Sequence, residues 1–224
     1  MSEHLESDFL FKLEQFWKTN QKRILTVVGG LAVVIGGWYA YNEFVKAPKE
    51  QKAQEALFRA EEYFGKDSFK FVLDGDGTSK GVLNVIKNYG GTNAANLAHY
   101  YAGVSYLHLG EFAKAVEHLK DFSSNSRAIQ MVAYGATGDA LSELKKNDEA
   151  INYYKKAASA FAEDELTSAE YLWRAGQLCE TINKNKEALE FYKEIKSKFP
   201  KAKQGEIDKF IYRLSIEKNE FSVH

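Results

Sequence analysis

The sequence predicts an all-α protein, in which an N-terminal transmembrane helix precedes a solenoid of helical hairpins closed by a C-terminal capping helix. Three observations predict this architecture. An uncharged apolar stretch runs from Ile24 to Tyr41. Beyond it, a glycine recurs at a nearly regular interval, at Gly103, Gly138 and Gly176, and an alanine recurs in step with it. The whole chain contains only 2 prolines, and proline is the residue least tolerated inside helices.

The segment 1–23 predicts an amphipathic tail. Leu5, Phe9, Leu13, Phe16 and Trp17 recur at helical spacing, with charged residues between them. A helix of this kind lies on a membrane surface, with its apolar side toward the lipid. A tail that binds a partner protein is the alternative.

The apolar stretch predicts a transmembrane helix over residues 24–45. Phe44 and Val45 extend it to the roughly 20 residues that a bilayer core requires. A cleaved signal peptide is the competing interpretation, but its apolar core spans only about 7–15 residues. The best cleavage site follows Ala47 and is disfavoured by Pro48. The sequence therefore favours an uncleaved anchor.

Charge leaves the orientation of this anchor open. Four basic residues precede the span and four follow it: Lys12, Lys18, Lys22 and Arg23, then Lys46, Lys49, Lys52 and Arg59. This balance gives no positive-inside signal. The usual single-pass arrangement has a short tail inside and a long translocated domain outside, and we adopt it as the expectation.

Small residues share one face of the span. They are Gly29, Ala32, Gly36 and Ala40. Such residues let a second membrane helix approach closely, so they predict a helix-packing site. The alternative is that glycine is simply common in membrane helices.

A repeat follows the span. Each unit has a glycine, then an alanine at a constant distance along the chain, and a bulky residue one helical turn further on. The three sets are Gly103, Ala115 and Leu119; Gly138, Ala150 and Tyr154; and Gly176, Ala188 and Tyr192. Glycine and alanine let two antiparallel helices touch, and the bulky side chain fills the space beside them.

Irregular elements flank the repeats. Helices are predicted over 49–64, opened by Pro48, and over 78–89, with an insertion at 65–77 between them. At the other end, a helix over 206–218 carries Ile207, Phe210, Ile211 and Leu214 on one stripe. This stripe predicts the cap that a solenoid requires.

No residue set predicts catalysis, a metal ion or a cofactor. The segment Asp74–Thr78 resembles the start of a calcium loop, but Val85 stands where the bidentate Glu is required; a polar turn that caps the next helix at Thr78 or Ser79 is preferred. His99, His108 and His118 lack a metal-binding spacing, and Cys179 occupies a packing position. A net charge of −1 gives no argument for nucleic acid.

Binding of proteins remains. The first helix of each hairpin is expected to line a concave face, aromatic at its flanks and acidic toward its centre. Such a face suits an extended and partly basic polypeptide, or another subunit. Packing of Tyr100 and Trp173 against neighbouring repeats is the alternative. The candidate residues are Leu97, Tyr100, Val104, His108, Asp139, Glu143, Trp173, Gln177 and Glu180.

The unit Asn96–Leu119 resembles the tetratricopeptide repeat in its small, Gly, Tyr, Gly, aromatic and Ala positions. The whole chain resembles the YfgM-like family of single-pass bacterial inner-membrane proteins, above all members from Bacteroidota. The segments Tyr89–Thr92 and Asn96–Gly103 carry most of this likeness. The resulting division is 1–23 cytoplasmic tail, 24–45 span, 46–95 neck and irregular hairpin, 96–200 three tetratricopeptide-like repeats, and 201–224 cap and C-terminus.

The resemblance implies an accessory subunit of the Sec translocon. Its partners would be SecYEG, a membrane-anchored periplasmic prolyl isomerase of the PpiD type, and translocating polypeptides. It also implies a cytoplasmic N-terminus and a periplasmic repeat domain. An envelope-assembly adaptor, and a regulatory tether that acts through the cytoplasmic tail, are the alternatives.

Overall fold

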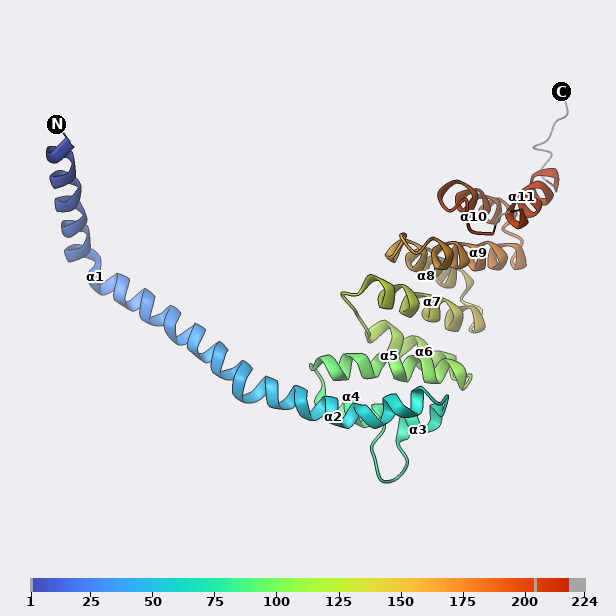
Figure 1. Cartoon of the computed structure of the whole chain (residues 1–224), viewed down its shortest axis with the longest axis horizontal. Helices are drawn as coiled ribbons and strands as arrows, with labels where there is room; N and C mark the ends of the chain where they lie inside the picture. The colour runs from blue at the N-terminus through green and yellow to red at the C-terminus, as the bar shows by residue number, and fades with distance from the viewer. Residues whose placement is uncertain (1, 204, 218–224) are drawn as a thin grey trace. The chain divides into compact units, whose positions relative to one another are not determined.

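The computed structural model describes residues 2–203 and 205–217, and these contain helices and no strand (Figure 1). The chain divides into two compact units, Met1–Gln51 and Lys52–His224. The first unit is a single helical segment. The second is a stack of helical hairpins.

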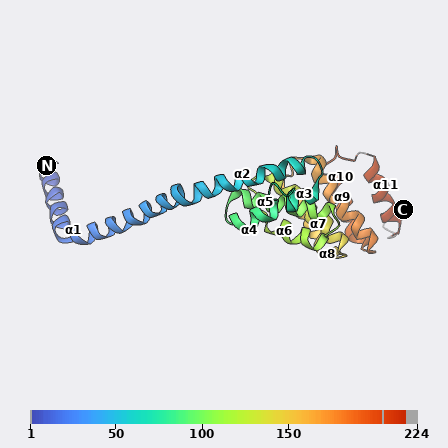
Figure 2. The ribbon, with the colours of Figure 1, turned by 90° about the horizontal axis from the view of Figure 1, so that it is seen from below.

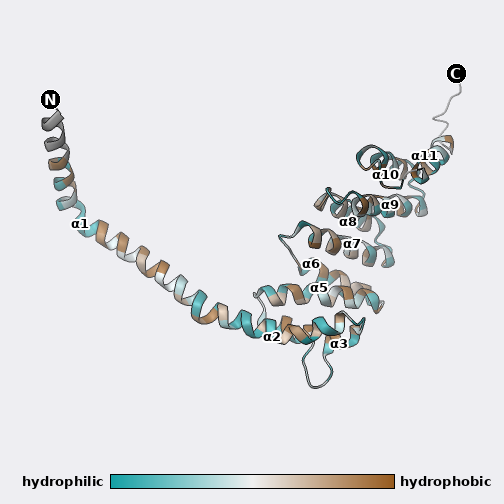
Figure 3. Ribbon diagram, in the orientation of Figure 1, coloured by the Kyte–Doolittle hydropathy of each residue, from teal (hydrophilic) through white to brown (hydrophobic). Residues whose placement is uncertain are grey.

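Helix α1 (Ser2–Tyr41) forms most of the first unit. Many of its residues are apolar, as the hydropathy colouring in Figure 3 shows. No residue from Leu10 to Gln51 is buried. One helix is long and apolar enough to cross a membrane by its length and composition, and none of its apolar window is buried. Within the described part of the chain, the predicted span is therefore a helix with no protein core around it.

The neck that follows α1 is helical throughout. A π-helical segment, Asn42–Lys46, joins α1 to α2 (Ala47–Phe64), and the N–H of Ala47 donates to the carbonyl of Asn42. Pro48 therefore does not open the helix, as the sequence predicted, but lies inside a helical segment. Proline lacks an N–H and its ring crowds the carbonyl four residues earlier, here that of Phe44. Widening of the preceding turn relieves this crowding.

Three hairpins form the body of the second unit. They are α5 (Asn93–His108) with α6 (Phe112–Asp121), α7 (Arg127–Glu143) with α8 (Asn147–Ala160), and α9 (Glu165–Thr181) with α10 (Asn185–Lys198). A Cβ added at Gly138 would lie 2.7 Å from the Tyr154 ring, and one at Gly176 would lie 2.5 Å from Tyr192. The glycine spacing therefore marks helix contacts, as predicted.

The turn inside each hairpin has one geometry. The first helix ends in a left-handed residue at Gly110, Lys145 and Asn183, with φ of 76°, 60° and 60°. In each turn the N–H five residues on donates back to the helix, from Glu111 to Tyr106, Lys146 to Leu141 and Lys184 to Cys179. This is the Schellman motif, which ends the first helix and reverses the chain.

The first hairpin is built differently from the prediction. Asp67 has the same left-handed backbone, φ 52°, and Ser68 donates to the carbonyl of Tyr63. Helix α3 (Phe69–Asp74) therefore begins as α6, α8 and α10 begin. The loop 75–81 then interrupts it, and α4 (Val82–Tyr89) follows. The insertion lies at 75–81, inside the second half of the hairpin, and not at 65–77 between its helices.

Two glycines close the base of this loop. A Cβ at Gly81 would lie 2.1 Å from the carbonyl oxygen of Leu73, and one at Gly75 would lie 2.0 Å from that of Ser79. The backbones touch there, so only glycine fits. Figure 1 shows the loop projecting from the α3 end of the stack.

The last element is the predicted cap, α11 (Glu206–Glu217). Ile207 and Leu214 are buried, and Phe210 and Ile211 pack against the core. Lys218, the predicted last residue of this helix, lies outside the described residues. Figure 2, turned from the first view, shows α9, α10 and α11 together at the C-terminal end of the stack.

Candidate functional site

The candidate binding residues fall on the first helices of the three hairpins, α5, α7 and α9. Their exposure differs widely. His108, Glu143 and Gln177 are exposed, whereas Leu97, Tyr100, Val104, Asp139 and Glu180 are half-buried. Trp173 is buried, with 6% of its surface exposed. The set is therefore not one uniformly accessible surface.

Trp173 packs inside the protein. Its ring meets those of Tyr192 at 5.2 Å and Phe210 at 4.5 Å, and Lys203 Nζ lies 4.6 Å from its centroid. Residues of α10, of α11 and of the turn between them thus enclose it. The cap covers the ring because a large aromatic side chain at the end of the repeats would otherwise remain in water.

Two further aromatic candidates also have neighbours. The Tyr100 ring lies 5.2 Å from that of Phe122, and burial raises the pKa of Tyr100. The His108 ring stacks on Phe69 of α3 at 4.3 Å with an interplanar angle of 5°. One face of the His108 ring is therefore covered by α3, a helix that lies within the predicted insertion 65–77.

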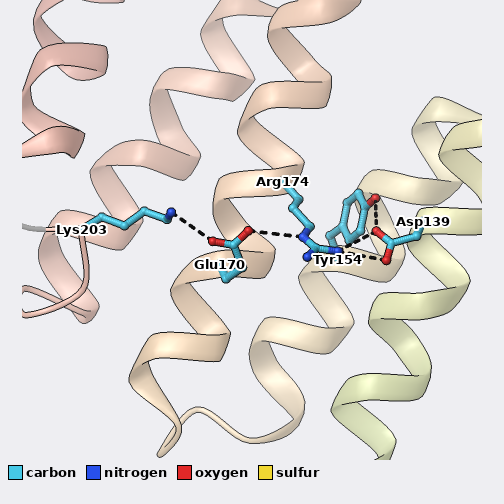
Figure 4. Close-up of polar contacts among 5 residues, drawn as sticks. All are labelled: Asp139, Tyr154, Glu170, Arg174 and Lys203. Carbon is cyan, nitrogen blue, oxygen red and sulfur yellow. Dashed lines mark hydrogen bonds and ion pairs between the residues drawn. The ribbon is translucent and has the colours of Figure 1, made fainter. Parts of the chain in front are cut away.

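A chain of charged groups crosses the candidate face (Figure 4). Arg174 Nη1 of α9 donates to both carboxylate oxygens of Asp139 in α7, at 2.9 Å each. Tyr154 donates to the same carboxylate at 2.8 Å. Arg174 Nε also reaches Glu170 at 3.4 Å, and Glu170 pairs with Lys203 Nζ at 3.0 Å. Asp139 and Glu170 are thus each compensated by a cation.

Glu180 is compensated in the same way. It accepts a hydrogen bond of 2.6 Å from Tyr192 and pairs with Arg213 of α11. Burial raises the pKa of Tyr192, and the hydrogen bond to Glu180 raises it further. Of the acidic residues at this face, Asp139, Glu170 and Glu180 are therefore paired with cations, whereas Glu143 is exposed. The pairing reduces the negative charge available to a basic peptide.

Tyr171 and Arg174 belong to the observed face, although the sequence pattern did not predict them. A Cβ at Gly135 of α7 would lie 2.2 Å from the Tyr171 ring, so α7 and α9 approach each other at this point. Arg174 follows its partner Asp139 by 35 residues, whereas the repeat glycines of the same two hairpins, Gly138 and Gly176, are 38 apart. Arg174 therefore lies about one helical turn before the position that corresponds to Asp139 in the repeat, and the repeat interval alone does not identify the pair.

In the loop that resembles a calcium site, the acidic side chain of Asp76 is hydrogen-bonded by groups of the protein. Asp76 Oδ1 accepts from the N–H and hydroxyl groups of Thr78 and Ser79, and Asp76 Oδ2 accepts from Tyr63 at 2.6 Å. The hydrogen bond from Tyr63 contributes most to lowering the pKa of Asp76. Thr78 and Ser79 do not cap a helix, since α4 begins only at Val82. The turn is polar, as predicted, but its polar groups serve the loop.

The remaining titratable candidates lie apart or in the core. His99 Nδ1 lies 3.2 Å from His118 Nδ1, beside an open polar pocket of about 490 Å³ that His99 lines, while His108 contacts Phe69 instead. Among the described residues, no group of three or more His, Cys, Asp or Glu side chains is arranged to hold a metal ion. Cys179 is buried, and burial raises its pKa to about 11, so it is a packing residue.

In the span, the four small residues are exposed. A Cβ at Gly29 or Gly36 would meet no atom within 4 Å, and Ala32 and Ala40 are exposed as well. The face is thus open to a second helix, which the chain itself does not provide in the first unit.

Comparison with known families identifies the repeats. One family model of the tetratricopeptide repeat matches residues 97–126, and a second matches residues 136–203. Both matches fall on the hairpins described above, and they support a tetratricopeptide-repeat protein. No curated protein is significantly similar to the chain. Tetratricopeptide repeats generally act as non-catalytic scaffolds that bind other proteins.

Proposed function

We propose that this protein is a membrane-anchored, non-catalytic scaffold that binds protein partners through its repeats. The observation that carries the proposal is the combination of two parts in one chain. The helix from Leu25 to Tyr41 carries exposed, mostly apolar residues, and tetratricopeptide hairpins follow it. A bilayer is the environment in which such a helix is stable.

More specifically, we propose an accessory subunit of the Sec translocon in a bacterial inner membrane. The tail would lie in the cytoplasm and the repeats in the periplasm, beside SecYEG and a membrane-anchored prolyl isomerase of the PpiD type. There the repeats would receive translocating polypeptides. The resemblance of the whole chain to the YfgM-like family supports this proposal.

Gly29, Ala32, Gly36 and Ala40 are the proposed docking face for a neighbouring membrane helix. Their lack of bulk lets two backbones approach, so that van der Waals contact replaces contact with lipid. The open space around Gly36 supports the proposal. A leucine at position 36 would fill that space and keep the partner away.

The exposed and half-buried residues of the first repeat helices are the proposed partner face of the solenoid. Val132 of α7 is 41% exposed, and Leu97 and Val104 of α5 are half-buried. Since Asp139, Glu170 and Glu180 are already paired with cations, apolar contact would dominate over charge. The preferred ligand is then an extended apolar segment, a change from the partly basic polypeptide that the sequence suggested.

Co-purification from membranes tests the proposal. The full chain is tagged after His224, solubilised in mild detergent and captured, and its companions are identified by mass spectrometry. SecY, SecE, SecG and a membrane-anchored prolyl isomerase in near-equal amounts are expected. Envelope-assembly factors in their place would contradict the translocon and favour the adaptor. A cytoplasmic factor lost on deletion of residues 1–20 would favour the tether.

Two pairs of variants separate the two faces. Gly36→Leu is expected to release the membrane subunits, whereas Val34→Leu, on the opposite side of the span, retains them. Val132→Asp is expected to release soluble clients, whereas Asn152→Asp, at an exposed site on α8, retains them. If both variants of a pair retain, or both lose, the same partner, the face that the pair tests is not a binding face.

A further inference from the structure

The first half of α1 carries a concentration of exposed apolar side chains that the span does not account for. Leu10, Phe11, Leu13, Phe16 and Trp17 are 47% to 63% exposed. A helix in water rarely exposes so many large apolar side chains together. We therefore expect lipid or another protein to cover them.

Four of these residues form a stripe. At about 100° per residue, Leu13, Phe16 and Trp17 fall within an arc of roughly 100°, and Leu10 lies at its edge. Ile24 at the start of the span continues the stripe. Gln15 lies on the opposite side of the helix, as does Phe11. The stripe thus leads directly into the apolar face of the membrane helix.

Side-chain hydrogen bonds mark the junction between the two segments. Thr19 Oγ1 donates to the carbonyl of Gln15 at 2.9 Å, and Asn20 Nδ2 donates to that of Phe16 at 3.0 Å. Bonds of this kind to the preceding turn bend helices. Both Figure 1 and Figure 2 show α1 bent within its first half. A bend there lets the tail leave the direction of the span.

The charges near the junction suit a lipid surface. Between Leu10 and Arg23 a single acidic residue, Glu14, is present, and it pairs with Lys18 at 2.6 Å. The bases of this stretch are Lys12, Lys18, Lys22 and Arg23. Basic groups beside an apolar stripe meet lipid phosphates while the stripe enters the acyl boundary.

We propose that residues 10–20 lie along the surface of the bilayer that the span crosses, with Leu13, Phe16 and Trp17 inserted below the headgroups. The inference rests on the proposed membrane anchor. Continuity with the span favours lipid over a protein partner, because no linker separates the stripe from the membrane. The tail then holds the helix at a fixed depth and tilt.

Depth measurements on the full chain test the inference. In a Cys179→Ala background, single cysteines replace Leu13, Gln15 or Val34, and each receives an environment-sensitive dye. The protein is reconstituted in vesicles of phosphatidylcholine and phosphatidylglycerol that carry doxyl-labelled lipids. Shallow doxyl groups are expected to quench the dye at 13 about twofold or more above the dye at 15. Deep doxyl groups are expected to quench the dye at 34.

The outcomes separate the two proposals. Weak quenching at both 13 and 15, with strong deep quenching at 34, would overturn the surface helix and leave the anchor in place. Weak quenching at 34 would overturn both. A third outcome is that the dye at 13 reports an apolar environment without being quenched by doxyl groups. If that signal disappears when the protein is diluted in lipid, a second copy of the chain covers the stripe, and the inference is overturned.

A matched pair of substitutions adds a second test. Phe16→Glu places a charge in the stripe and is expected to lower shallow quenching at position 13 severalfold, while Gln15→Glu leaves it unchanged. Neither residue is buried, so the fold of the solenoid does not depend on them. Equal quenching in both variants would contradict insertion of the stripe.

Discussion

Single glycines set the spacing of the hairpins. Gly103, Gly138 and Gly176 each lie against the bulky residue that follows them in the repeat, Leu119, Tyr154 or Tyr192. No side chain fits between the helices at these points. Because the contact depends on one missing methyl group, it is sensitive to the smallest substitution.

Gly138→Ala is expected to destabilise the solenoid by about 1–3 kcal/mol, since the new Cβ overlaps the Tyr154 ring. Urea unfolding followed by near-UV circular dichroism measures the change. Gly36→Ala is the matched control, a helical glycine whose Cβ would meet nothing. An unchanged unfolding midpoint for Gly138→Ala would show that Tyr154 moves away freely.

The histidine pair predicts a dependence of stability on pH. Burial lowers the pKa of both His99 and His118; Asp121 and Glu117 oppose this effect, Lys114 adds to it at His118, and Tyr106 stacks on the His118 ring. The unfolded chain, with histidine pKa values of about 6.5, therefore binds more protons than the folded chain. Stability is fully present above this value and falls as pH drops through it.

Substitution of both histidines tests whether they cause the loss of stability at low pH. The free energy of unfolding of the natural protein is expected to fall between about pH 7.5 and about pH 5. The fall should be smaller in the variant His99→Gln/His118→Gln. The same slope in both proteins would mean that other groups cause the pH dependence.

At the scale of elements, one turn geometry is used with different residues. The left-handed position holds Gly110 in the first of the three repeats but Lys145 and Asn183 in the next two. Glycine adopts this backbone freely and asparagine tolerates it, whereas lysine is strained by about 1–2 kcal/mol. The second repeat therefore has a weak point at its turn.

Lys145→Gly is expected to stabilise the protein by about 0.5–1 kcal/mol, because relief of strain exceeds the added freedom of the unfolded chain. Thermal unfolding measures it. The control Lys155→Gly, at an exposed site in the middle of α8, should destabilise the protein by about 1 kcal/mol instead. A lower melting temperature for Lys145→Gly would show that the lysine side chain makes a compensating contact.

The contact between α7 and α9 combines close packing at Gly135 with the ion pair of Asp139 and Arg174. These two side chains are 34% and 41% exposed, so water screens their attraction. A double-mutant cycle with Asp139→Asn and Arg174→Gln should give a coupling of about 0.5–1 kcal/mol. The coupling should shrink in high salt. A coupling of zero would assign the contact to the Tyr171 ring alone.

At the scale of the whole molecule, the two units have different sources of stability. The solenoid buries a continuous core from Ala53 to Leu214, whereas the first unit buries nothing from Leu10 to Gln51. We therefore expect the solenoid to fold without the apolar helix of the first unit. An exposed apolar helix of this kind is stable in a bilayer, or in a detergent in its place.

Removal of residues 1–45 tests this independence. The fragment 46–224 is expected to be soluble, helical and monomeric, with a melting temperature within about 2–4 °C of the full chain in detergent. Circular dichroism and light scattering measure both properties. Aggregation of the fragment, or a much lower melting temperature, would show that the first unit stabilises the repeats.

The sequence by itself determined the apolar helix, the hairpins and the cap. These follow from local periodicity and from small residues at a fixed interval, which are properties of neighbouring positions along one chain. The glycines at 103, 138 and 176 predicted helix contacts because each glycine and the side chain that it touches belong to consecutive helices of one hairpin.

Only the tertiary structure decided which candidate residues remain available to a partner. Trp173 is enclosed by Phe210, and Asp139 is neutralised by Arg174. The loop at 75–81 interrupts a helix rather than preceding it. Each outcome depends on a side chain or a backbone contact from another element, and periodicity within one helix carries no information about the neighbour that it meets.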